Sequence, residues 1–141
     1  MLTDAVLRIP TIKSPMVIVA LVVSLAILAA LTVMQVLLIA GAPIGEYAWG
    51  GQHRVLPSRL RVAAVVAIAL YAVFAALLLS RGGILPGVRS AVIVVGAWVL
   101  FGYAVLSVLP NLVSKSRKER NVQAPISILL AISIGLVATL S

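Results

Sequence analysis

Cysteine is absent from this chain of 141 residues, and acids and histidines are scarce. Without a thiol, thiolate catalysis, disulfide exchange and iron–sulfur ligation are excluded. The acids are Asp4, Glu46 and Glu119, and the single histidine is His53. A zinc site uses three or four His, Cys or carboxylate ligands, and a bis-histidine haem takes two histidines. We therefore expect no metal, no cofactor and no catalytic set of residues.

Charge is also scarce, because only 10% of the residues are charged while 63% are hydrophobic. The mean hydropathy is +1.25. A soluble domain is roughly one quarter charged and about half apolar. A chain this apolar cannot cover its surface with polar groups, so we predict that lipid is its solvent.

Four continuous apolar runs stand out, and each is close to the roughly 20 residues that cross a bilayer as a helix. They cover residues 15–40, 60–80, 88–109 and 124–141. The first is too long for the core of a cleaved signal peptide, so we expect it to be retained as a span. Continuous runs favour helices over an alternating barrel strand. The predicted fold is all-α, a polytopic transmembrane four-helix bundle in a single membrane domain over residues 1–141.

The eleven Lys and Arg residues lie outside the apolar runs or at their ends, where they orient helices and contact anionic headgroups. We therefore expect the bilayer and no nucleic acid as partner. With four spans, the first and third connections share one side. They carry seven basic residues (Arg54, Arg59, Arg61, Lys115, Arg117, Lys118 and Arg120) against four on the other side (Arg8, Lys13, Arg81 and Arg89). The positive-inside rule then makes loops 41–59 and 110–123 cytoplasmic, with both termini outside.

No acid, lysine or arginine lies inside a span away from its ends, which argues against transport coupled to a proton on a buried carboxylate. Polar groups gather instead at the end of the bundle with the first and third connections. Gln35 is costly in lipid, so it should face the bundle, as a helix–helix hydrogen bond or as a ligand contact. The candidate ligand-binding residues are Gln35, Glu46, His53, Arg54, Arg59, Arg61, Tyr103 and Asn111.

The first connection, from Gly41 to Ser58, is rich in glycine and longer than a short hairpin needs. It is either an interfacial loop anchored by Tyr47 and Trp49, or a re-entrant cap over the bundle mouth. In the second case Glu46 would hold a polar ligand together with Arg59 or Arg61. Tyr71 and Trp98 lie near mid-depth of their spans, and could line a cavity for a quinone or lipid tail or simply pack or face lipid.

Small residues recur every four positions in the fourth span, at Ser127, Ala131, Gly135 and Thr139. Such ridges let helix backbones approach closely in a membrane. The ridge predicts either packing within the bundle or the face of a homodimer. A larger membrane complex is a further alternative.

The loop Gly41-Ala-Pro-Ile-Gly-Glu-Tyr-Ala-Trp-Gly-Gly51 and the segment Asn111-Leu-Val-Ser-Lys-Ser-Arg-Lys-Glu-Arg120 resemble those of a group of small, uncharacterised bacterial four-helix membrane proteins. The similarity covers most of the chain from the first span onward. It implies the same architecture and a place in the bacterial inner membrane, and it is tied to no activity.

Our leading hypothesis is a small non-enzymatic accessory or ligand-binding module that recognises its ligand through the first and third connections. An alternative is a homodimeric transporter of a lipid-like or uncharged solute, associated through the ridge of the fourth span. Another is a membrane enzyme acting on a lipid headgroup, with Glu46 as base and Arg59 or Arg61 binding phosphate.

Overall fold

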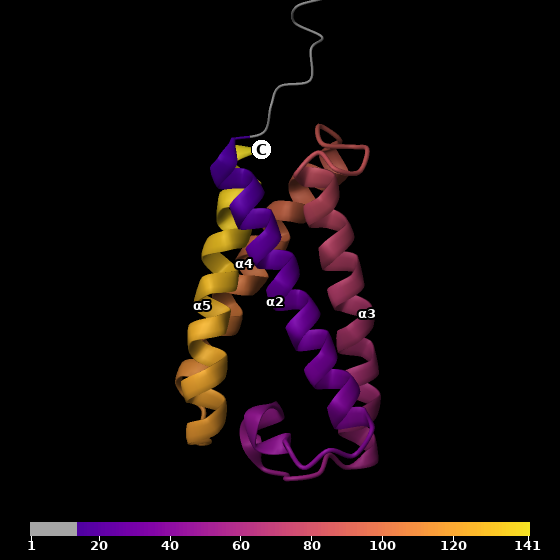
Figure 1. The fold of residues 1–141 in the computed structure, drawn as a ribbon, viewed down its shortest axis with the longest axis vertical. Coiled ribbons are helices and arrows are strands. Elements are labelled where there is room, and N and C mark those ends of the chain that lie inside the picture. Colours follow the sequence, from indigo (N-terminus) through magenta and orange to yellow (C-terminus); the bar gives the residue numbers. More distant parts are fainter. Residues whose placement is uncertain (1–13) are drawn as a thin grey trace, which may run out of the picture.

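The computed structural model describes residues 14–141, so the basic residues Arg8 and Lys13 lie outside the described part. Four long helices form an antiparallel bundle, and two short 3₁₀ turns lie in the first connection (Figure 1). No strand occurs among residues 14–141. The elements are α2 (Pro15–Ile39), η1 (Gly45–Tyr47), η2 (Trp49–Gly51), α3 (Ser58–Arg81), α4 (Ala91–Leu112) and α5 (Arg117–Leu140).

All four helices are long and apolar enough to cross a membrane, with lengths of 22 to 25 residues. At about 1.5 Å per residue, each exceeds the roughly 30 Å of a bilayer's hydrocarbon core. The predicted all-α transmembrane bundle is therefore confirmed as a fold class.

The fourth helix begins at Arg117, seven residues earlier than the apolar run at 124–141 suggested. The Ser116 hydroxyl accepts a hydrogen bond from the Glu119 backbone N–H at 3.3 Å and so caps the helix. Arg, Lys, Glu and Gln are good helix formers in the turns that follow. Hydropathy marks only the lipid-embedded part of a helix, which is why the charged start of α5 was assigned to the connection.

The helices pack unevenly around the bundle. The most extensive contact joins α4 and α5, and α2 contacts both α3 and α5. In Figure 1, α2 runs obliquely, close to α5 at its own start and close to α3 at its end. Contact between α3 and α4 is small by comparison, although the two helices are consecutive.

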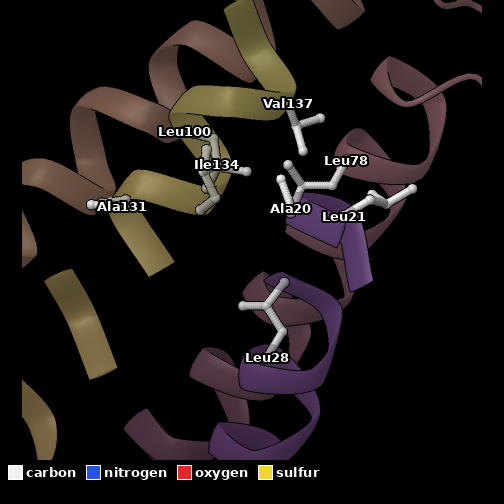
Figure 2. Packing of buried hydrophobic residues seen from close by; sticks show 9 residues of the cluster. Ala20, Leu21, Leu28, Leu78, Leu100, Ala131, Ile134 and Val137 are labelled. Atoms are coloured by element: carbon white, nitrogen blue, oxygen red, sulfur yellow. The ribbon is translucent and has the colours of Figure 1, made fainter. Parts of the chain in front are cut away.

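The buried hydrophobic residues form two clusters near opposite ends of the bundle. The larger joins all four helices through residues such as Leu21, Leu78, Leu100 and Ile134 (Figure 2). The smaller joins the end of α2 and the start of α3 to the first connection, and contains Leu38, Ala48, Leu56 and Ala64. In each cluster apolar side chains contact one another instead of lipid. Because lipid is equally apolar, the stabilisation comes from close packing between the helices.

Three of the four positions of the small-residue ridge of α5 face the bundle. Ser127 and Ala131 are buried, and a Cβ atom added at Gly135 would come within 2.7 Å of the Phe101 ring of α4, whereas Thr139 is exposed. Packing within the bundle therefore accounts for the first three positions. The homodimer alternative stays a prediction.

Candidate ligand-binding cavity

The first and third connections lie at the same end of the bundle and are joined by hydrogen bonds. The Ser116 hydroxyl donates to the Glu46 carbonyl oxygen at 2.6 Å, and the Gly50 N–H donates to Glu119 Oε1 at 3.4 Å. Gln123 Nε2, one turn further along α5, donates to the Tyr47 carbonyl oxygen at 3.1 Å. These bonds fix residues 46–50 against the start of α5.

An ion pair adds to this contact, with Lys118 Nζ 2.6 Å from Glu46 Oε2. The same ammonium group lies 5.6 Å from the centre of the Tyr47 ring, within range of a cation–π interaction. The hydrogen bond from Lys118 and its charge hold the pKa of Glu46 below its usual value of 4.5. Both side chains are well exposed, so the pair contributes less than a buried one would.

The backbone of the first connection needs glycine where it meets α5. Gly51 has a φ of +70°, and a Cβ atom there would lie 2.3 Å from Ser116 Cβ. Gly50 has a φ of +80° and open space around it. The preceding Trp49 is itself at a φ of 54°, which is uncommon for a non-glycine residue. This conformation places the Trp49 indole so that Nε1 donates to Gln35 Oε1 at 3.3 Å.

Between the two hydrophobic clusters lies a cavity of about 800 Å³. It is formed by the second halves of α2 and α4, by residues 63–74 of α3, and by residues 119–134 of α5. Ala48, Trp49 and Gly50 close its end. The first connection therefore forms a cap over this end of the cavity, but Glu46, Arg59 and Arg61, which the cap interpretation placed around a ligand, are not in its lining.

Because α3 and α4 make little contact and lining side chains on both helices are exposed, we infer that the cavity opens sideways between them. Several of its lining side chains are exposed on the outside of the bundle, including Val66, Leu70, Tyr103 and Leu106. In a bilayer this opening would face the hydrocarbon chains. A molecule dissolved in the membrane could enter there without crossing water.

The two ends of the cavity differ in polarity. Toward the larger hydrophobic cluster the lining is apolar, with residues such as Leu28, Leu70, Phe74 and Ile134. Toward the cap, polar groups join apolar ones such as Met34, Ala48 and Pro110. The polar lining of the cavity consists of Gln35, Trp49, Tyr71, Tyr103, Ser107, Asn111, Glu119, Gln123 and Ser127. The site thus has the amphipathic profile of a bilayer lipid or a similar amphiphile.

Of the eight residues predicted from the sequence, three line the cavity. Gln35 is buried and faces the bundle as expected, and Tyr103 and Asn111 lie across from it on α4. Asn111 Nδ2 donates to the Ser107 carbonyl oxygen at 3.1 Å, so its amide is already oriented.

The other five predicted residues are not among those that line the cavity. Glu46 pairs with Lys118, and Arg61 Nε donates to the Leu56 carbonyl oxygen at 2.8 Å. Arg54 and Arg59 are exposed, and His53 is half-buried within the first connection. The geometry therefore does not bring Glu46 and the two arginines of α3 together around a common ligand.

The sequence analysis missed Glu119 and Gln123, which are both buried and both line the cavity. A signal for them existed. They precede Ser127 and Ala131 at the same four-residue spacing, so they continue the inward-facing ridge of α5. Treating residues 110–123 as a loop hid this periodicity.

The two mid-depth aromatic residues have different environments. Tyr71 lines the cavity and packs against Phe74, with ring centroids 6.4 Å apart. Trp98 is 45% exposed on α4 and packs edge-on against Phe101. One of the two therefore lies at the predicted position for a hydrophobic ligand.

Among residues 14–141, no group of three or more His, Cys, Asp or Glu side chains is placed to hold a metal ion. The chain matches no protein-family model, and neither a curated protein nor a solved structure is significantly similar to it. Its function therefore has to be inferred from the geometry of the cavity.

Proposed function

We propose that the chain is a non-enzymatic, ligand-binding module of the membrane that takes an amphiphile from the bilayer. The polar head of the ligand lies beneath the cap, beside Gln35, Asn111 and Gln123. Its hydrocarbon chain lies along the apolar lining between α3 and α4. The observation that carries the proposal is the cavity of about 800 Å³, polar at the capped end and apolar beyond it.

Two features support binding over catalysis or translocation. Glu46, the acid that a headgroup enzyme would use as base, is paired with Lys118 and has a lowered pKa, so it is a poor proton acceptor. At Gly135, the ridge through which a transporter dimer would associate is already packed against Phe101 of α4. A binding module needs neither of these elements.

The setting that we propose is the bacterial inner membrane, with the capped end in the cytoplasm. The contacts between Ser116 and Glu46, and between Glu119 and Gly50, support a shared side for the first and third connections. These connections and their flanks carry the seven basic residues counted above, which the positive-inside rule assigns to the cytoplasmic face. There the same residues can contact anionic headgroups.

The test is native mass spectrometry of the protein released from its own membrane into a mild detergent, with two tryptophan variants of α3. Ala67 lines the cavity, whereas Ala69 is exposed and does not. We expect the native protein and Ala69→Trp to retain a discrete bound mass, and Ala67→Trp to lose it because the indole fills the site. A native protein without bound mass, or equal retention by both variants, would overturn the proposal.

A further inference from the structure

The capped end of the cavity carries one charged group, the carboxylate of Glu119. This side chain is 8% exposed and lines the cavity. Its Oε2 accepts from the Ser114 hydroxyl at 2.7 Å, and its Oε1 accepts from the Gly50 N–H at the long distance of 3.4 Å. A carboxylate has about four acceptor sites, so these two bonds leave acceptor capacity unused.

No positive side chain balances this carboxylate. Within residues 14–141, no Lys, Arg or His lines the cavity, and none forms an ion pair with Glu119. The neighbouring Arg120 is directed elsewhere, since its Nη1 donates to the Ser114 carbonyl oxygen at 3.0 Å. The position of Glu119 in the first turn of α5 stabilises its negative charge through the helix dipole, but supplies no cation.

Several hydrogen-bond donors at this end of the cavity are already used within the protein. The indole N–H of Trp49 is donated to Gln35, and the hydroxyl hydrogens of Ser107 and Ser127 are donated to backbone carbonyl oxygens in their own helices. Gln123 and Asn111 each direct an amide hydrogen to a carbonyl oxygen, which fixes the orientation of both amides. Donors remain on Gln35, Asn111 and the tyrosine hydroxyls, but the one charged group among the lining residues is the Glu119 carboxylate.

Aromatic rings also line the cavity, further from the cap than Glu119. Tyr71, Phe74 and Tyr103 line the same cavity, and the rings of Phe74 and Tyr103 lie 5.5 Å apart. The faces of such rings attract cations electrostatically. A phosphate or carboxylate headgroup would meet the unfavourable charge of Glu119, with no positive side chain in the lining to offset it.

From this juxtaposition we propose that the headgroup bound beneath the cap is a protonated amine, so that the ligand is a lipophilic ammonium compound. This inference rests on the proposed function and names its ligand class. The ammonium N–H groups donate to the Glu119 carboxylate and neighbouring amide oxygens, and the hydrocarbon chain occupies the apolar end. The lateral opening between α3 and α4 admits the ligand from the membrane.

The experiment compares four probes that share a twelve-carbon chain and differ in their headgroup: dodecylamine, dodecyltrimethylammonium, dodecanol and dodecanoic acid. Each is titrated at neutral pH into the full chain in nanodiscs of zwitterionic two-chain lipid. The readout is Trp49 emission in a Trp98→Phe background, because Trp49 lines the cavity and Trp98 lies outside it. Glu119→Gln is the test variant, and Glu46→Gln is the matched control, being the other described acid and no part of the lining.

A charge-assisted hydrogen bond is roughly twice as strong as a neutral one, so we expect dodecylamine to bind about tenfold more tightly than dodecanol. Dodecyltrimethylammonium, which has charge but no N–H, should fall between them, and dodecanoic acid should bind most weakly. Glu119→Gln should reduce the preference for the amine to near unity while leaving dodecanol binding unchanged. Glu46→Gln should retain the native ranking.

The outcomes separate the two proposals. For these outcomes the site is filled with phenylalanine, so that no tryptophan is added to Trp49. If dodecanol binds saturably and Ala67→Phe abolishes this, but dodecylamine binds no more tightly, the ammonium assignment is overturned while the amphiphile site stands. If no probe binds saturably, or Ala67→Phe binds them as Ala69→Phe does, the proposed function itself fails. The order of probe affinities measured without the Glu119 substitution tests the ammonium assignment even if Glu119→Gln does not fold.

Discussion

At the scale of single residues, close approach between α4 and α5 depends on one missing side chain. Gly135 lets the Phe101 ring lie against the backbone of α5, and a Cβ atom there would be 2.7 Å from the ring. Gly102 on α4 also lies in a membrane helix, but has open space around it. The two glycines therefore form a natural pair of test and control.

We expect Gly135→Leu to lower the free energy of unfolding by about 1–3 kcal/mol, the usual cost of overpacking a core. Gly102→Leu should change it far less, because its side chain would point into lipid. Thermal unfolding in detergent measures both. Loss of a dimer by Gly135→Leu at unchanged monomer stability would contradict the interior position of the ridge.

The ion pair between Glu46 and Lys118 gives a pH dependence whose direction follows from the structure. Because the folded-state pKa of Glu46 is below its ordinary value of 4.5, the pair stabilises the fold above that value and is lost as the pH falls through the lowered pKa. A double-mutant cycle with Glu46→Gln and Lys118→Gln should show coupling at neutral pH that weakens as the pH falls below 4.5. Coupling that grew on acidification would show that the pair does not form.

At the scale of elements, the cap is held by the meeting of the first connection with the start of α5. Gly51 and Gly50 share the left-handed conformation, with φ values of +70° and +80°. Only Gly51 packs against Ser116, where an added Cβ atom would lie 2.3 Å from Ser116 Cβ. The difference between alanine variants at these two positions isolates the contact from the backbone strain.

Gly50→Ala should cost about 1 kcal/mol, because alanine disfavours a positive φ. Gly51→Ala should cost clearly more and should also raise the hydrogen-exchange rate of the Gly50 amide, whose bond to Glu119 would be broken. Equal effects of the two substitutions would mean that the cap does not pack on α5 as described.

The helix boundaries belong to this scale as well. The sequence placed the first three spans close to their observed positions, since continuous apolar runs coincide with helices in lipid. It missed the first two turns of α5, where Ser116 and Glu119 cap a helix of charged residues that hydropathy does not register. Because those turns were missed, the sequence analysis also missed Glu119 and Gln123, which hydrogen-bond to the cap and line the cavity.

At the scale of the whole molecule, the orientation in the membrane can be tested by labelling single introduced cysteines. The chain has no cysteine of its own, so the native protein gives no labelling signal. Gln52 is exposed in the first connection, and Ile84 is exposed in the turn between α3 and α4 at the other end. In intact bacterial cells, a membrane-impermeant maleimide should label Ile84→Cys and leave Gln52→Cys unlabelled until the membrane is opened. The reverse pattern would place the basic end outside and contradict the positive-inside assignment.

The sequence by itself determined that the helices are embedded in lipid, that the fold is all-α, and that polar groups gather at one end of the bundle. Hydropathy and chain length are sums over local composition, and in lipid every span must satisfy its own backbone hydrogen bonds. Gln35, Tyr103 and Asn111 could be assigned to that end because position along a span fixes depth in the membrane.

Only the tertiary structure decided which of these groups share a cavity. Helix α2 crosses from α5 to α3 and leaves α3 and α4 apart, and this opens the space that Tyr71 faces and Trp98 does not. Rotation of each helix about its axis depends on packing with its neighbours, which composition does not encode. For the same reason Glu46 faces Lys118, whereas Glu119 faces the cavity.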